Sequence, residues 1–161
     1  MTDLPSRYRR HGAIIDTNIL LLFFVGSFRR DLIGQRRTEK FVPEDFDLIV
    51  SVMDYFTPVV TTPNVLTEVN NLMPNWIGPT YFEVFAQGIA LLREEYTPSK
   101  EIAAHPAFPI VGLTDTGIIQ AATQGGYLVI TDDWTLRQFL GHAGVDALNF
   151  EELRFQNWQG R

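Results

Sequence analysis

Apolar stretches and helical apolar stripes alternate along the chain, and polar or Pro- and Gly-containing stretches separate them. The first apolar stretch, residues 13–16, predicts a buried strand, and residues 17–25 predict a helix that Gly26 ends. Because this helix is apolar all round, we expect it to be buried rather than amphipathic. Residues 26–41 are polar and rich in arginine, which predicts a loop or a loosely packed excursion.

Strands and helices continue to alternate after this excursion. Pro43 suits the first turn of a helix, because its φ angle is fixed and its missing N–H is not needed there. The further elements that we predict are a helix at 43–56, a strand at 57–61, a helix from the cap Thr62 to the stop Pro74, a helix at 79–96, a short turn at 100–105 capped by Ser99, a helix from the cap Thr114, a strand at 127–130, a helix at 134–140 ended by Gly141, and a strand at 145–150. Such alternation predicts an α/β fold, namely a three-layer α/β/α sandwich with a central, mostly parallel sheet, as one domain over residues 1–161.

Composition narrows the class of protein without identifying its function. The chain has 161 residues, of which 45% are hydrophobic, so a single domain can bury a sizeable core. It has no cysteine, which excludes disulfides, thiolate metal sites and a cysteine nucleophile. The longest apolar run, residues 19–25, is too short to span a membrane, and Asp16 interrupts any signal-peptide core. We therefore expect a cytoplasmic protein that does not enter a membrane.

Carboxylates recur at the ends of predicted strands and on the apolar faces of predicted helices. Asp16 stands between two apolar stretches, where a carboxylate is costly unless a cation neutralises it. Glu68 lies on the apolar face of its helix, and Asp115 lies in the first turn of another. The pair at 132–133 follows an apolar strand. Together these positions predict a shared hard-metal site, and hence hydrolytic or phosphoryl-transfer chemistry.

Most of these carboxylates also have an ordinary structural explanation. Asp16 and Asp133 suit helix N-caps, and Asp115 is favoured by the dipole of its helix. Glu68 is harder to explain in this way, because a glutamate on an apolar face is rarely left unpaired. Ligands of parallel sheets bind beyond the carboxyl ends of the strands, where these four side chains could meet. Both interpretations stay open at this point.

The net charge of −6 conceals an uneven distribution of charge. Residues 1–40 hold eight of the 13 Lys and Arg side chains but only four of the 19 Asp and Glu side chains. A basic segment beside a carboxylate-rich site suits a nuclease, because the first attracts phosphates and the second holds a metal. The candidates for phosphate contact are Arg29, Arg30, Arg36 and Arg37. A solvated basic surface, a docking site for a protein partner and a contact with a second copy of the chain are the alternatives.

Four segments carry the acidic residues in a fixed order. They are residues 14–20 (IIDTNIL), 62–69 (TPNVLTEV), 112–122 (GLTDTGIIQAA) and 128–133 (LVITDD). These segments resemble, in the same order, the four acidic motifs of PIN-domain ribonucleases, and they span most of the chain. Each is weak alone, and the order of all four carries the resemblance. The Arg-rich residues 26–41 are the main departure from the compact toxin members of that family.

The resemblance implies a metal-dependent endoribonuclease that hydrolyses RNA phosphodiester bonds with Mg²⁺ or Mn²⁺. The residues that it implies as metal ligands and catalytic groups are Asp16, Glu68, Asp115 and Asp133. Asp133 fits the fourth motif better than Asp132, which is then a second ligand or a helix cap. The candidates to orient the ligating carboxylates are Thr17, Asn18 and Thr131. Many relatives are toxins held by an antitoxin, so the partners implied are RNA, an antitoxin protein and a second copy of the chain in a homodimer.

Two other classes of function stay open. The first is an aspartate-based, Mg²⁺-dependent phosphotransfer domain. A haloacid-dehalogenase-like site needs Asp-x-Asp on the first strand, where this chain has Asn18 in the third position. A receiver domain needs a lysine late in the sheet, and neither Lys40 nor Lys100 follows a predicted strand. The second class is a non-catalytic RNA- or protein-binding module on the same fold, whose mark would be a broken acidic set; here the set is complete.

Overall fold

The structure, a computed structural model, describes residues 3–73 and 78–159. The strands are β1 (Ala13–Ile15), β2 (Val59–Thr61), β3 (Arg93–Glu94), β4 (Leu128–Thr131) and β5 (Ala147–Asn149). The helices are α1 (Leu4–Tyr8), α2 (Thr17–Phe28), the 3-10 helix η1 (Arg30–Leu32), α3 (Pro43–Tyr55), α4 (Pro63–Leu72), α5 (Thr80–Ala90), α6 (Ser99–Ala103), α7 (Phe108–Gly125), α8 (Trp134–His142) and α9 (Phe150–Gln159).

The five strands form one parallel sheet in the order β3-β2-β1-β4-β5. Ile14 of the central strand is in register with Val60 on one side and Val129 on the other. The chain moves outward from β1 through β2 to β3, and it then crosses back over the sheet to enter β4. This reversal makes the carboxyl ends of β1 and β4 the switch point of the sheet, which is where open α/β sheets bind their ligands.

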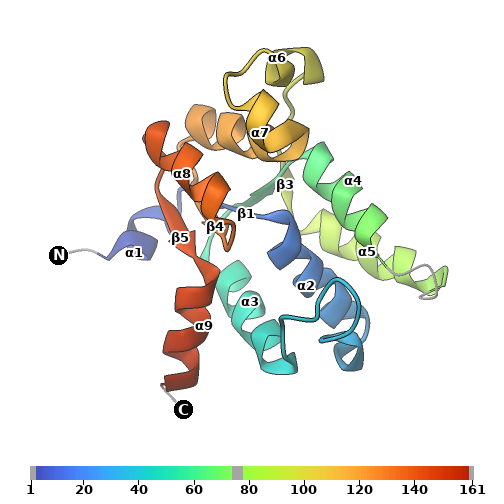
Figure 1. Cartoon of the computed structure of the whole chain (residues 1–161). Helices are drawn as coiled ribbons and strands as arrows, with labels where there is room; N and C mark the ends of the chain where they lie inside the picture. Colours follow the sequence, from blue (N-terminus) through green and yellow to red (C-terminus); the bar gives the residue numbers. More distant parts are fainter. Residues whose placement is uncertain (1–2, 74–77, 160–161) are drawn as a thin grey trace.

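Helices cover both faces of the sheet and complete three layers (Figure 1). Helix α2 contacts α3, α4 and α5, and helix α7 contacts α4, α6 and α8. In Figure 1, α7 and α8 lie above the sheet, and α2 and α3 lie below it. The expected α/β/α sandwich is therefore confirmed, and its sheet is wholly parallel. Among the described residues, no helix is both long enough and apolar enough to cross a membrane.

The apolar helix after β1 forms the centre of the core, as expected from its sequence. Residues 19–26 of α2 are all buried. The prediction that Gly26 ends this helix was wrong, because α2 continues to Phe28. Gly26 has a different role: a Cβ atom placed there would lie 2.2 Å from the ring of Phe46 on α3. The glycine therefore allows α2 and α3 to approach each other closely.

The Arg-rich segment after α2 is better ordered than the sequence predicted. Its first residues continue α2 and then form η1. Leu32, Ile33 and Phe41 are buried in the main core, so the segment is not a loosely packed excursion. Polar residues surround these three apolar residues, so the average polarity of the segment did not indicate that it is anchored in the core.

The middle of the chain agrees with the prediction in part. Helix α3 begins at Pro43, and α4 is capped by Thr62, whose hydroxyl accepts a hydrogen bond of 3.2 Å from the Val65 N–H. The predicted stop at Pro74 lies outside the described residues. The single helix predicted over residues 79–96 was wrong, because α5 ends at Ala90 and the edge strand β3 follows.

The remaining departures from the prediction lie in the second half of the chain and at its start. Helix α7 begins at Phe108, earlier than the predicted cap Thr114, but its backbone breaks at Gly112, where φ is 82°. The last strand is shorter than predicted, and the unpredicted helix α9 begins directly after it at Phe150. The unpredicted helix α1 precedes β1 and joins the start of β5 through a hydrogen bond of 2.8 Å from the Tyr8 hydroxyl to Asp146.

Candidate metal centre

Asp16 lies directly after β1, at the switch point of the sheet. Its backbone N–H donates to the Ile130 carbonyl over 2.9 Å, which ties it to the end of β4. One carboxylate oxygen accepts from the Thr17 N–H at 2.7 Å, as an N-cap of α2, and the other accepts from the Thr131 hydroxyl at 2.6 Å. The residue is only 5% exposed.

Burial raises the pKa of Asp16 to about 6. The hydrogen bonds from Thr131 and Thr17 oppose this rise, and the charges of Asp132 and Asp133 add to it. A carboxylate in this position favours a nearby cation, because the hydrogen bonds alone do not compensate for its loss of water.

The hydroxyl of Thr131, the last residue of β4, connects two of the predicted site residues. It donates to Asp16 and accepts a hydrogen bond of 3.0 Å from the Asp133 N–H. Asp133 in turn caps α8, since its carboxylate accepts from the Leu136 N–H at 2.8 Å. Both Asp16 and Asp133 therefore have the capping roles that the sequence allowed, and a buried threonine links them at the same end of the sheet.

Asp115 and Glu68 approach this end of the sheet from two helices that contact each other, α7 and α4. Burial raises the pKa of Asp115 to about 7, and the charges of Asp16, Asp133 and Glu68 raise it further. Like charges raise a carboxyl pKa only when they lie nearby, so the four carboxylates share one region. We call Asp16, Glu68, Asp115 and Asp133 the acidic edge.

The carboxylates of the acidic edge are not close enough together in this structure to coordinate one metal ion. Within residues 3–73 and 78–159, no three His, Asp or Glu side chains lie close enough together to hold a metal ion between them. The chemistry of the donors nevertheless suits Mg²⁺ or Mn²⁺, which prefer carboxylate oxygens. The hydroxyls of Thr17 and Thr116, each directly after one of the carboxylates, are buried and have no hydrogen-bond partner among the described residues. Buried polar atoms without partners are typical of places where a water or ion belongs.

Asp132 has a different partner from its neighbour Asp133. Its carboxylate forms an ion pair with the ammonium of Lys40, and its side chain is 5% exposed whereas that of Lys40 is 45% exposed. Reasoning from the sequence missed Lys40, because 92 positions separate the two residues and Lys40 follows no strand. Its only signal was that a buried carboxylate requires a cation and the chain has two lysines.

The remaining predicted site residues, Asn18 and the four arginines, lie on the surface of the protein. Asn18 is exposed at the start of α2. Arg29 and Arg30 are paired with acidic side chains of their own surface, at 2.6 Å to Asp31 and 2.5 Å to Asp47. Arg36 and Arg37 are both exposed, have positive φ angles of 29° and 46°, and lie in the turn that leads to Lys40. Arg36 and Arg37 are thus close in sequence to Lys40, the partner of Asp132, whereas Arg29 and Arg30 form ion pairs with Asp31 and Asp47.

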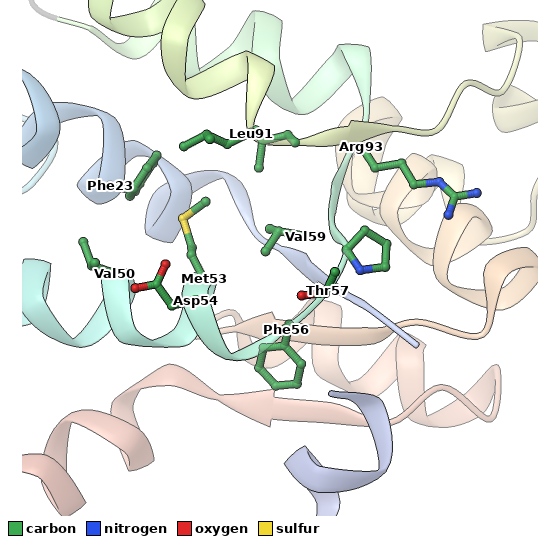
Figure 2. Close-up of a pocket in the computed structure, with 11 residues that line it drawn as sticks. Phe23, Val50, Met53, Asp54, Phe56, Thr57, Val59, Leu91 and Arg93 are labelled. Atoms are coloured by element: carbon green, nitrogen blue, oxygen red, sulfur yellow. The ribbon is translucent and has the colours of Figure 1, made fainter. Parts of the chain in front are cut away.

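A cavity of about 530 Å³ lies at the other end of the sheet, beside the start of β2 and β3. Its walls are mainly apolar, and Figure 2 shows Val50 and Met53 of α3 facing Leu91 across it. Asp54 and Arg93 are its two charged lining residues. The cavity lacks the group of carboxylates that marks the acidic edge, so we place the candidate centre at the acidic edge.

Comparison with known proteins adds no assignment, because no protein-family model matches the chain and no curated protein matches its sequence.

Proposed function

We propose that the protein is a metal-dependent endoribonuclease of the PIN type. The observation that carries the proposal is the grouping of Asp16, Glu68, Asp115 and Asp133, whose charges act on one another at the switch point of a parallel sheet. Their repulsion is unfavourable in the absence of a cation, and a bound divalent ion would relieve it. The order of the four acidic motifs along the chain supports the same proposal.

In this proposal the four carboxylates of the acidic edge hold Mg²⁺ or Mn²⁺. When bound, the ion supplies a water of lowered pKa and neutralises charge on the phosphoryl oxygens of RNA. Thr131 keeps Asp16 in place through its hydroxyl and fixes the backbone of Asp133. Asp132 serves as the partner of Lys40 rather than as a ligand.

The proposal extends to the setting of the enzyme. By resemblance, it is a cytoplasmic toxin, is inhibited by an antitoxin protein and forms a homodimer. A small gene that overlaps the start of this one would support the toxin pair, and the mass in solution tests the dimer.

The direct test is cleavage of structured and single-stranded RNA by purified protein with Mn²⁺. Glu68→Gln and Asp115→Asn should each abolish cleavage and leave the circular dichroism spectrum unchanged, because each removes a repelling charge. A matched control is Asp54→Asn, which changes a carboxylate of the distant cavity. Failure of the parent protein to cut either RNA would contradict the proposal, and retained RNA binding would then favour a binding module.

One observation favours an aspartate-based phosphotransfer domain as a second candidate. Lys40 lies at the carboxyl end of the sheet through its pair with Asp132, and a receiver-type site needs a lysine there. Against it, Asp16, the side chain that would accept the phosphoryl group, is buried and has both carboxylate oxygens in hydrogen bonds. Incubation with acetyl phosphate and Mg²⁺ separates the two: a phosphoryl mass increase on Asp16 favours the second candidate, and its absence with RNA cleavage favours the nuclease.

A further inference from the structure

Lys40 and Asp132 form an ion pair in which the two partners are unequally buried. The carboxylate is almost fully enclosed, but nearly half of the lysine side chain is exposed. An ammonium group has three N–H donors; among the described residues Lys40 donates to Asp132, and its ammonium also lies over the Phe41 ring, 5.1 Å from the ring centroid. Burying both charges would cost free energy of desolvation, whereas this pair leaves the ammonium in contact with water. The pair thus presents a partly exposed cation at Asp132, the residue that precedes Asp133 in the chain.

A side chain of α9, Arg154, holds the backbone of Lys40 in place. The guanidinium of Arg154 donates to the Lys40 carbonyl at 2.9 Å and pairs with Asp45 of α3 at 2.9 Å. Arg154 also donates to Glu151 at 2.8 Å, and its side chain is 7% exposed. One buried arginine thus joins α9, α3 and the segment that carries Lys40.

The residues on either side of Lys40 are fixed as well. The Phe41 ring packs against Phe150, with ring centroids 6.1 Å apart, and against the Arg154 guanidinium at 5.3 Å. On the other side, the buried Thr38 hydroxyl donates to the Gln35 carbonyl at 2.7 Å and accepts from the Gly34 N–H at 3.2 Å. Contacts of the neighbouring residues therefore hold the backbone of Lys40 in place, and only its side chain remains free to adjust.

We propose that Lys40 is an RNA-contacting residue that binds a backbone phosphate beside the acidic edge, and that Asp132 and Arg154 position it. The inference rests on the proposed nuclease function and adds a substrate contact to it. An edge made of carboxylates repels RNA, so a cation held among them is needed where the strand enters. Arg36 and Arg37, whose side chains are exposed, lie four and three positions before Lys40 and add positive charge to the same segment. The lysine supplies a point charge suited to a single phosphate.

The two lysines of the chain allow a footprint that does not depend on cleavage. The protein is treated with an amine-acylating reagent, without divalent metal, in the presence and absence of single-stranded RNA, and the modified peptides are quantified by mass spectrometry. With RNA at about ten times its Kd, acylation of Lys40 should slow by about tenfold while that of Lys100 on α6 stays constant. Equal rates at Lys40 with and without RNA would overturn the inference.

Salt dependence of binding provides a second, independent measurement. Lys40→Met should lower the slope of log K against log salt by about 0.7, the contribution of one phosphate contact on a single strand. Lys40→Arg should restore the slope, and Lys100→Met should leave it as in the parent. An unchanged slope for Lys40→Met would also overturn the inference.

These outcomes separate the inference from the proposed function. If the parent protein cuts RNA but Lys40 is neither protected nor involved in the salt slope, the inference alone fails. If Lys40 is protected but no RNA is cut with Mn²⁺, the contact stands and the nuclease function fails.

Discussion

Thr131 and Asp16 lie 115 positions apart in the chain, and their side chains are joined by a buried hydrogen bond of 2.6 Å. Thr131 ends β4 and Asp16 follows β1, so the bond connects the two strands that flank the switch point. Because the same hydroxyl accepts from the Asp133 N–H, one side chain controls the placement of two acidic residues.

Thr131→Val should destabilise the protein by about 2 kcal/mol, because it removes a hydrogen bond to a buried, charged acceptor. The pKa of Asp16 should rise above its value in the parent, since this hydrogen bond lowers it. Urea denaturation at pH 8 measures the first effect, and carboxyl chemical shifts during a pH titration measure the second. Thr131→Ser keeps the hydroxyl and should resemble the parent; equal losses in both variants would argue against a role for the bond.

The two raised carboxyl pKa values predict how stability depends on pH without metal. Unfolded aspartate titrates near 3.8, whereas folded Asp115 titrates at about 7 and Asp16 at about 6. Between these values the folded state holds protons that the unfolded state has lost. The contribution of these two carboxyl groups to the free energy of unfolding is therefore fully present below pH 4 and is lost as the pH rises to about 7.

The melting temperature of Asp115→Asn, relative to that of the parent, should thus increase between pH 4 and pH 8 when both are measured in a chelator. Millimolar Mg²⁺ or Mn²⁺ at pH 8 should raise the melting temperature of the parent, and Asp16→Asn should lose most of that increase. A constant difference between parent and variant across this pH range would contradict the electrostatic account.

The buried pair between Arg154 and Asp45 should matter far more than a surface pair. Their side chains are 7% and 0% exposed, so Arg154→Met leaves an uncompensated buried carboxylate and should cost about 3 to 5 kcal/mol. The control is Arg30→Ala, which breaks the exposed pair with Asp47 and should cost about 1 kcal/mol or less. Chemical denaturation gives both values. Adding Asp45→Leu to Arg154→Met should recover part of the loss, and a further loss would contradict the pairing.

Substitution by alanine should have opposite effects on stability at two helical glycines, one in the close contact of α2 with α3 and one in open space on α8. Gly26→Ala should destabilise by about 1 to 3 kcal/mol, because its Cβ would overlap the Phe46 ring. Gly141→Ala on α8 should stabilise by roughly 0.5 kcal/mol, because no atom lies near its Cβ and alanine favours a helix. Urea midpoints of the two variants are the measurement, and a neutral Gly26→Ala would show that α3 can move away at little cost.

Local patterns predicted the α/β/α architecture with its parallel sheet and proposed the residues of the acidic edge, but not the strand order or the long-range contacts. Asp16 and Asp133 were predictable because Asp16 directly follows an apolar strand, Asp133 comes two residues after another, and the carboxyl ends of parallel strands meet. Strand β3 was missed because an exposed two-residue edge strand depends on backbone pairing with β2, which leaves no hydrophobic pattern. Helix α9 was missed because its sequence shows little amphipathic periodicity.

Lys40 shows the limit of local reasoning most clearly. Its place beside Asp132 depends on Arg154 and Phe41, and these contacts join three segments that are far apart in the sequence. No short stretch of the sequence contains all of these residues, so the pair of Lys40 with Asp132 becomes apparent only in the folded structure.

The most direct measurement of the central claim locates the metal in the folded chain. Fe²⁺ replaces Mg²⁺, ascorbate and peroxide generate hydroxyl radicals at the bound ion, and mass spectrometry identifies the backbone cuts. The account predicts four clusters of cuts, near Asp16, Glu68, Asp115 and Asp133, all suppressed by excess Mg²⁺ and lost in Asp16→Asn. Cuts concentrated elsewhere, or none above those of the chelated protein, would contradict a metal centre at the acidic edge.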